Sequence, residues 1–382
     1  MENKQSKKIK FLHCSDIHLD APMLGIPQDK ADERRRELRA TFMRMMEFVR
    51  ERDIDYVLIC GDLFDTAYAT NTTLEILIRE FKACSGTTFI IAPGKHDCFE
   101  NNPLYASGRL PENCYVFSSD ALSRFDFEED RLTFYGWAFK TDSLTSSPIA
   151  EHRASDASKI NIVMGYADLD GSLDSQDCPV SSADMNSFGA DYYAFGGRHA
   201  RTEFVKRGGS MYSYSGSLEC TGFENPYLGG VKLLTVDYNE GELGIDGKHV
   251  SFGHLKFVTE TIDITGVNAN NEITNRISKL ISTKKYGMDT ALRAELVGNI
   301  DPRFTVPTHI ESDAFGLYYF EMVDKTLPLY GTEHFKRDMS VAGEIYRRLL
   351  PMLESEREED RLLAARALRA GLAALENREI EV

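Results

Sequence analysis

The sequence predicts an α/β fold in which short buried strands alternate with amphipathic helices. Apolar runs such as Tyr56–Cys60 are rich in strand-favouring residues and bounded by aspartate and glycine, a pattern typical of strands buried on both faces. Apolar residues at helical spacing separate the first runs. Aspartate and histidine follow several runs, and the carboxyl ends of parallel strands are where such folds bind ligands. We therefore expect a polar site along one edge of a sheet.

The length of 382 residues indicates one large domain and a smaller one. A hydrophobic content of 42% with 27% charged residues is typical of soluble globular proteins. A glycine-rich polar stretch over residues 239–253 is a candidate boundary. We expect a large domain over 1–250, a small α/β accessory (capping) domain over 251–335 and a helical tail over 336–382.

The net charge of −16 argues against a broad basic surface for non-specific nucleic-acid binding. A local basic patch or a metal could still bind a phosphodiester. Seven scattered cysteines without a C-x-x-C pair indicate a reducing compartment. The polar N-terminus lacks the apolar region of a secretion signal, and no apolar run approaches the length of a membrane span. We therefore expect a cytoplasmic protein that does not enter a membrane.

The first predicted strand, Ile9–Cys14, leads into a short motif that contains Asp16 and His18. Side chains two apart face the same way in extended backbone, and a carboxylate with an imidazole is a ligand pair for zinc, manganese or iron. The alternative is a loop aspartate and a histidine satisfied within the fold. A predicted helix over 32–52 and the strand before Asp62 complete a β–α–β unit with both acidic ends on one edge. Asp62 alone could also cap a helix.

The alternation continues through the middle of the chain. A predicted helix over 73–84 precedes a strand at Thr88–Ala92, which leads into a polar turn over 93–97. An acidic turn at 128–130 predicts antiparallel strands around it, at 115–117, 124–127 and 132–139. A Ser-rich surface loop is expected over 141–158, and further strands are expected at 160–164, 192–195, 211–215 and 231–236. The strand over 192–195 ends in a glycine-rich loop that contains His199.

The C-terminal part predicts a strand over 257–264, a helix over 270–281 and a helical tail over 340–375 with a break at Pro351. Leucine and alanine form a stripe along the tail at Leu362, Leu363, Ala365, Leu368, Leu372 and Leu375. Such a stripe is a packing surface in most helices, and a partner or dimer face is the alternative.

The order of these motifs over residues 9–236 resembles the calcineurin-like metallophosphoesterase superfamily. The motifs are D-x-H, G-D-x-x-D, G-x-H-D and a glycine-rich loop that ends in histidine. The phrases at residues 11–20 and 61–65, and the Tyr-Ser-Gly-Ser of 214–217 followed by Gly-Phe-Glu at 222–224, resemble the bacterial DNA-repair exonuclease branch of the SbcD and YhaO type. The resemblance implies a four-layer αββα sandwich of two mixed sheets flanked by helices, with residues 1–250 as the phosphoesterase domain.

In that family two metals, often manganese, clamp a phosphodiester and activate a water. The resemblance assigns the first metal to Asp16, His18, Asp62 and His199. It assigns proton transfer to the leaving oxygen, or a hold on the phosphate, to His96. Asp97, the next residue along, would orient the His96 imidazole.

The second metal lacks most of the ligands that the resemblance implies. The sequence has Lys95 for an asparagine, Gly165 for a histidine and Gly197 for another histidine, and keeps only the bridging Asp62. A charged ammonium cannot ligate a metal, because it has no acceptor. We therefore expect one divalent metal, manganese first with zinc or iron as alternatives, and no second metal. Lys95 would pair with Asp62 and contact a phosphate, or alternatively point to solvent.

Basic residues of the last loop could hold phosphates. Arg198 lies between a glycine and His199 and is expected to face the site and bind substrate. Arg201 could contribute, while Lys206 and Arg207 could equally be solvated surface charges.

We therefore expect the protein to be a metal-dependent phosphodiester hydrolase that resembles a DNA-repair exonuclease and is impaired by loss of the second metal. The alternative is an inactive phosphoesterase-fold module that binds nucleic acid, with DNA ends expected, or a coiled-coil ATPase partner. The tail over 340–375 would be a candidate for the ATPase contact, and a homodimer is also open. A phosphatase acting on a small phosphoester is the third interpretation.

Overall fold

The computed structural model divides the chain into two compact units, Met1–His254 and Leu255–Val382. Each unit is described by itself. The residues that the structure describes are 8–23, 28–100, 102–171, 175–220, 222–223, 228–239, 242–301, 304–307, 310, 312–328 and 336–375. Glu224, part of one family phrase, lies outside them.

The first unit contains two six-stranded mixed sheets. The strands of the first sheet are, in spatial order, β14 (Glu242–Ser251), β13 (Gly230–Asn239), β1 (Ile9–Cys14), β2 (Tyr56–Cys60), β3 (Thr88–Ala92) and β4 (Cys114–Val116). Those of the second are β11 (Val205–Arg207), β12 (Ser210–Tyr214), β10 (Tyr192–Gly196), β7 (Ile160–Tyr166), β6 (Leu132–Gly136) and β5 (Ser123–Phe127). The short strands β8 (Asp168–Leu169) and β9 (Pro179–Val180) pair with each other.

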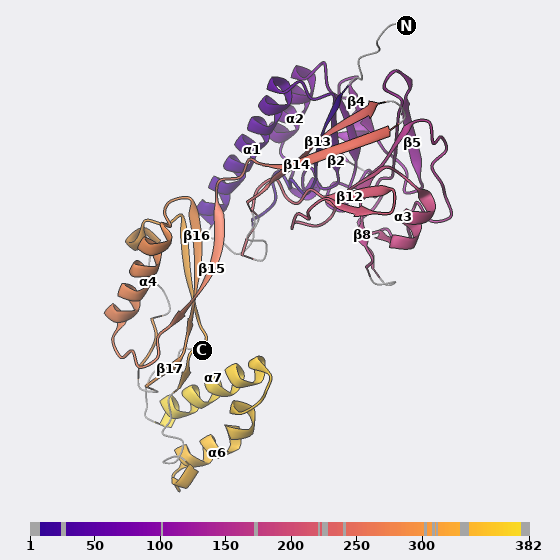
Figure 1. The fold of residues 1–382 in the computed structure, drawn as a ribbon. Coiled ribbons are helices and arrows are strands. Elements are labelled where there is room, and N and C mark those ends of the chain that lie inside the picture. Colours follow the sequence, from indigo (N-terminus) through magenta and orange to yellow (C-terminus); the bar gives the residue numbers. More distant parts are fainter. Residues whose placement is uncertain are drawn as a thin grey trace. The chain divides into compact units, whose positions relative to one another are not determined.

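Three apolar layers hold the first unit together, as the predicted αββα sandwich requires. Helices α1 (Gln28–Glu51) and α2 (Asn71–Ala83) pack on one face of the first sheet through a core that includes Phe42 and Phe81 (Figure 1). A second core fills the space between the two sheets. A third lies under α3 (Ser182–Phe188) on the outer face of the second sheet. The predicted α/β class and four-layer architecture are therefore confirmed.

The strands that carry the polar motifs run parallel to one another within each sheet. β1 pairs parallel with β2, and β2 with β3, while β7 pairs parallel with β10. Their carboxyl ends meet because hydrogen bonds join the loops that follow them. Asp16 N donates to Gly61 O at 3.0 Å, and Gly197 N donates to Asp16 Oδ2 at 3.1 Å. Loops far apart in the sequence thus converge at one edge.

Two local predictions are wrong, and the candidate boundary contains a strand. The strand near Tyr115 is not part of an antiparallel set, because β4 pairs parallel with β3 in the first sheet. The glycine-rich stretch 239–253 contains a full strand, β14, because its alternating residues pair with β13 over ten positions. Pro351 does not break the tail: it lies inside α6 (Val341–Leu353), and the break comes after residue 353.

The second unit is built on a parallel sheet of β15 (Lys256–Asp263), β16 (Thr290–Val297) and β18 (Tyr319–Asp324). Helix α4 (Asn270–Lys284) buries Ile273, Ile277 and Ile281 at helical spacing. Strands β17 (Asn299–Ile300) and β19 (Leu327–Pro328) form a short parallel pair.

The tail forms two helices, α6 and α7 (Glu358–Leu375), which share a small apolar cluster. Leu368 and Leu372 pack against Tyr346 in this cluster, and Arg369 pairs with Asp324 of β18 at 2.6 Å. Part of the predicted stripe is therefore packing surface, while Leu363 and Leu375 are exposed. Within the described residues, the helices are too short or too polar to span a bilayer.

Candidate metal centre

Four side chains that the sequence predicts as ligands lie together at the shared edge. Asp16 and His18 follow β1, Asp62 follows β2 and His199 follows β10. Ligand atoms of Asp16, His18 and His199 all lie within 4.8 Å of one another. His18 Nε2 is 3.1 Å from His199 Nε2 and 3.7 Å from Asp62 Oδ2, and His199 Nε2 is 3.9 Å from Asp16 Oδ1.

This donor set fits one divalent cation. Two imidazole nitrogens bonded to one ion at about 2.1 Å lie roughly 3.0–3.4 Å apart in tetrahedral or octahedral geometry, and the two Nε2 atoms match that spacing. Burial raises the pKa of Asp62 well above its usual value; His18 opposes that shift, and the charges of Asp97 and Asp16 add to it. A cation would offset this clustering of buried negative charge.

The backbone that presents these ligands adopts left-handed conformations. φ is +49° at Asp16, +53° at His18 and +55° at Asp62. Such conformations cost on the order of 1–3 kcal/mol in non-glycine residues and persist where neighbouring structure fixes them. Here two loops fix each other, because Ile17 N and His18 N both donate to Asp62 O, at 2.9 and 3.0 Å. The strained loops aim the side chains inward.

Asp65 sets the orientation of the His18 ring. Its Oδ1 lies 2.7 Å from His18 Nδ1, which leaves Nε2 turned toward the other ligands, as in the carboxylate–histidine–metal arrangement of many metal sites. Burial lowers the pKa of His18, but the hydrogen bond to Asp65 and the charges of Asp62 and Asp16 outweigh burial and raise it to about 9. Asp65 is the last residue of the G-D-x-x-D motif, but the motif alone does not predict its contact with His18.

His96 lies beside the cluster, and its role stays a prediction. Its side chain is exposed, and its ring centroid lies 5.0 Å from that of His18. The backbone N–H of His96 donates to Asp62 Oδ1 at 2.8 Å, which ties the third loop to the proposed ligand.

The expected role of Asp97 is wrong. Its buried carboxylate accepts from the backbone N–H groups of Asp62 and Leu63 at 3.0 Å, from Gly94 N at 2.7 Å and from Tyr105 Oη at 2.6 Å. The His96 imidazole is not among its described partners. Asp97 therefore positions the loops after β2 and β3 rather than orienting His96.

The expected pairing of Lys95 with Asp62 is also wrong. Lys95 Nζ instead forms an ion pair at 2.8 Å with Asp177, which lies 82 residues along the chain next to β9. Both side chains are partly exposed. The ammonium group thus has a carboxylate partner outside the set of proposed ligands.

Tyr166, rather than Gly165, faces the half of the predicted two-metal site that lacks most of its expected ligands. A Cβ on Gly165 would lie 2.6 Å from Trp137 Cε2, so that position faces the core. The alternation of side chains along β7 turns the next residue toward the ligands. The buried Tyr166 ring packs on Gly197, where an added Cβ would lie 2.8 Å from Tyr166 Cε1, and its Cβ lies 3.0 Å from the Cβ position of Gly61.

The charge environment of Tyr166 agrees with this placement. Burial raises the pKa of its hydroxyl, and the charges of Asp62 and Asp16 add to the shift. Arg198, in contrast, is exposed, and its guanidinium lies over the Tyr214 ring with Cζ 5.4 Å from the centroid. Its expected contact with substrate stays a prediction.

Comparisons with known proteins find a matching family model and several relatives. Residues 9–201 match the family model described as calcineurin-like phosphoesterase. The uncharacterized metallophosphoesterase YhaO of Bacillus subtilis is 29% identical over 205 residues, which cover 50% of this chain and 49% of YhaO. The chain therefore spans about half the length of that relative.

Two further relatives carry names from DNA metabolism. The DNA double-strand break repair protein Mre11 of Methanopyrus kandleri is 24% identical over 322 residues, covering 76% of this chain and 67% of the relative. A component of the nuclease SbcCD of Staphylococcus epidermidis is 26% identical over 267 residues, covering 61% of this chain and 67% of the relative. Among solved structures, a dimetal phosphatase from Danio rerio aligns with a TM-score of 0.40 and 11% identity over 64% of this chain and 99% of that protein.

Proposed function

Because the chain belongs to the calcineurin-like phosphoesterase family, we propose that its first unit binds nucleic-acid phosphodiesters, with DNA ends expected, through a single divalent cation and hydrolyses them slowly. Asp16, His18, Asp62 and His199 would hold that cation. The observation that carries the proposal is the Tyr166 ring, which packs on Gly197 where a two-metal site needs a donor.

The cation would supply a Lewis acid that polarises the phosphodiester, with manganese as the expected metal and zinc or iron as alternatives. The residues of this chain then provide position and proton transfer. Asp65 holds the His18 ring, and Asp97 holds the loops that present Asp62 and His96. The exposed His96 imidazole, beside His18, would donate a proton to the leaving oxygen.

Slow hydrolysis follows from the lost second cation. A two-metal site stabilises both the attacking and the leaving oxygen, so removal of one metal costs several kcal/mol at the transition state. Each 1.4 kcal/mol is about tenfold in rate, so the expected loss is several orders of magnitude. Lys95 does not compensate by pairing with Asp62, since its ammonium pairs with Asp177.

A phosphoesterase-fold module without activity is the second candidate, and the same Tyr166 placement favours it. Such a module would bind nucleic acid or a protein partner. Leu363 of α7 is 60% exposed and Leu375 is 47% exposed, which leaves part of the stripe for a coiled-coil ATPase or a second copy of this chain.

The two candidates separate in one experiment on the full chain loaded with manganese. Hydrolysis of bis(p-nitrophenyl) phosphate and of end-labelled DNA is measured beside DNA binding, with Asp16→Ala as the control. Slow, manganese-dependent turnover that Asp16→Ala abolishes supports the hydrolase. Manganese-dependent binding without turnover supports the module. Neither binding nor turnover in the presence of manganese would overturn the hydrolase and the nucleic-acid-binding module, and would leave only a module that binds a protein partner.

A further inference from the structure

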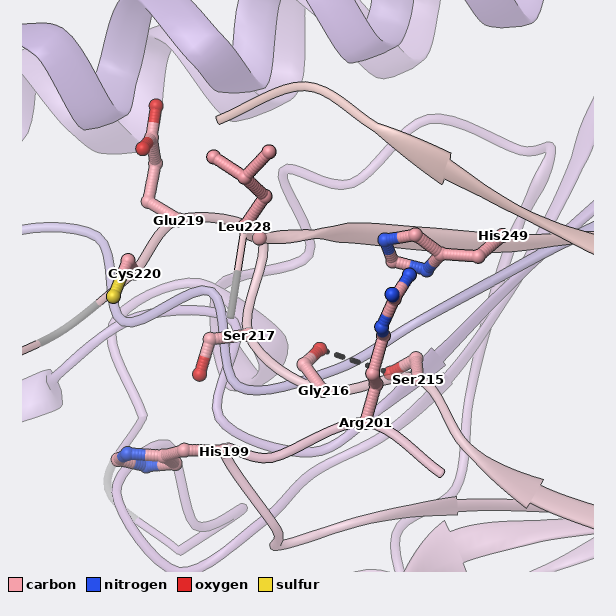
Figure 2. A pocket seen from close by; sticks show the side chains of 10 residues that line it. His199, Arg201, Ser215, Gly216, Ser217, Glu219, Cys220, Leu228 and His249 are labelled. Carbon is pink, nitrogen blue, oxygen red and sulfur yellow. Dashed lines mark hydrogen bonds between the residues drawn. The ribbon is translucent and has the colours of Figure 1, made fainter. Parts of the chain in front are cut away.

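A pocket lies directly beside the candidate metal centre and shares His199 with it (Figure 2). Its walls come from the loop after β10, the loop over residues 215–220 and strand β14. Besides His199, the lining residues that matter here are Arg201, Ser217, Glu219 and His249. In Figure 2 the Ser217 hydroxyl points toward His199, and the Arg201 guanidinium lies next to the His249 ring.

Polar atoms that line this pocket lack hydrogen-bond partners within the described part of the chain. They are Ser217 Oγ, in a side chain that is only 5% exposed, Glu219 Oε2 and both ring nitrogens of His249. Buried polar groups are almost always satisfied, and an unmade hydrogen bond is costly. Ser217 Oγ and the one N–H of a neutral His249 ring can therefore donate to a ligand beside His199, whereas Glu219 Oε2 can only accept.

The charges around the pocket favour an anion. Arg201 is joined by Lys232, which lies opposite His249 in the pairing of β13 with β14 and donates to Thr202 O. Burial lowers the pKa of His249 to about 4, the charges of Arg201 and Lys232 add to the shift, and the backbone of Leu228 opposes it. Two cationic groups thus lie near one ring that can donate a hydrogen bond.

Glu219 is the acidic residue of the lining, and the side chains that contact its carboxylate lie outside the pocket. Thr41 Oγ1 donates to its Oε1, and Arg34 Nη2 lies 3.6 Å from its Oε2. Figure 2 shows this carboxylate turned toward the neighbouring helix and away from Arg201 and His199. The charges that act on the His249 ring are therefore those of Arg201 and Lys232.

We propose that Arg201, Ser217 and His249 form an anion subsite that binds the phosphate adjacent to the phosphodiester held at the cation. This inference rests on the proposed function for the identity of the ligand as a polynucleotide. A substrate with a single phosphate engages the cation alone. A strand with consecutive phosphates engages both sites, which gives the domain its preference for polymers over small phosphoesters.

The test compares ligands with one and with several phosphates on the full chain loaded with manganese. The probes are bis(p-nitrophenyl) phosphate and a single-stranded oligothymidylate, and the variants are Arg201→Gln and Ser217→Ala. Lys206→Gln, an exposed basic residue of β11 outside the pocket, is the matched control. Arg201→Gln is expected to weaken oligothymidylate binding about tenfold or more and to lower the slope of log affinity against log salt by about 0.7.

The same variant should leave manganese affinity and the inhibition constant of bis(p-nitrophenyl) phosphate unchanged, and Lys206→Gln should change oligonucleotide affinity by less than about twofold. Ser217→Ala should weaken the oligonucleotide several-fold with no change in the salt slope, because it removes a neutral donor. Equal effects of Arg201→Gln and Lys206→Gln on the oligonucleotide would overturn the subsite and leave the proposed function standing.

A second readout does not depend on the proposed function. In metal-free protein, inorganic phosphate should shift the NMR signals of the His249 ring, and Arg201→Gln should abolish the shift. Phosphate binding at His249 in a protein that binds no nucleic acid would support the subsite while the proposed function fails. No shift with phosphate, together with an unaffected oligonucleotide affinity in Arg201→Gln, would end the proposal.

Discussion

The two halves of the predicted two-metal site lie at the ends of neighbouring strands of one scaffold, yet they differ in what those strand ends carry. One half brings two carboxylates and two imidazoles together, with His18 Nε2 and His199 Nε2 only 3.1 Å apart. The other half presents a buried tyrosine ring, a glycine and a lysine engaged with Asp177. The fold brings these positions to one edge, and we expect the single side chains there to decide whether a cation binds.

The second half of the predicted site lacks most of its expected ligands, and the Tyr166 ring occupies part of its space. Gly197 has no Cβ, and a side chain at that position would collide with Tyr166. A histidine at residue 197 would therefore require the Tyr166 ring to move.

The largest effect is expected from rebuilding the second half. Lys95→Asn combined with Tyr166→His removes the ring and adds an amide oxygen and an imidazole near Asp62. We expect a second manganese per chain and a rate of bis(p-nitrophenyl) phosphate hydrolysis that rises about a hundredfold or more, because a second Lewis acid is restored.

Tyr166→Phe is the matched control for this variant, since it keeps the ring and loses only the hydroxyl. It should hold one manganese and show the wild-type rate. Equal metal content in the double variant and in Tyr166→Phe would show that the ring does not exclude the second cation.

The next effect concerns the first half. His199→Ala removes one of two imidazole donors and should lower manganese affinity by about a hundredfold or more. Isothermal titration with manganese measures the change. His96→Ala, which alters a neighbouring exposed histidine, should keep manganese affinity and lower turnover instead. The account of the ligand set fails if the two variants lose affinity equally.

A smaller loss is expected from Asp65→Asn. The amide can still accept a hydrogen bond from His18 Nδ1, but it lacks the charge that makes the imidazole a stronger ligand. Manganese affinity should fall about tenfold, the low end of the range for such outer partners. Asp177→Asn, which removes the carboxylate paired with Lys95, is the control and should leave manganese affinity unchanged.

The smallest effect is expected on the stability of Asp62→Asn relative to the wild type, and its sign should change when manganese is added. Asp62 lies buried near Asp16 and Asp97. In chelator, Asp62→Asn should therefore stabilise the protein by about 1 kcal/mol, a rise of roughly 2–4 °C in Tm for a unit of this size. With manganese at a hundred times Kd, the wild type gains about 2.7 kcal/mol and becomes the more stable protein. Thermal unfolding with and without manganese measures both differences.

Much of the architecture follows from local sequence patterns. The buried runs at Ile9–Cys14, Tyr56–Cys60 and Thr88–Ala92 are strands as predicted, because apolar β-formers bounded by turn residues leave few alternatives. The polar motifs that follow them lie together for the same reason. The convergence of Asp16, His18, Asp62 and His199 was therefore within reach of the sequence, while their role as ligands stays a prediction.

The errors arise where one residue of register or a distant partner decides the outcome. β7 runs to Tyr166 rather than ending at Met164, and a shift of one residue exchanges the two faces of a strand, so the residue facing the site was misassigned to Gly165. The partner of Lys95 lies in an irregular segment 82 residues away, and local sequence patterns cannot predict a contact over that separation. Asp97 mainly accepts hydrogen bonds from backbone N–H groups. Almost every residue has such a group, so the sequence does not show which ones a carboxylate will contact.

We propose that this edge of the sheet holds one cation and not two. The most direct measurement titrates the full chain with manganese and follows bound metal by mass spectrometry and by electron paramagnetic resonance. We predict saturation at one manganese per chain with the spectrum of an isolated ion. Saturation at two ions per chain with a spin-coupled spectrum would contradict the account.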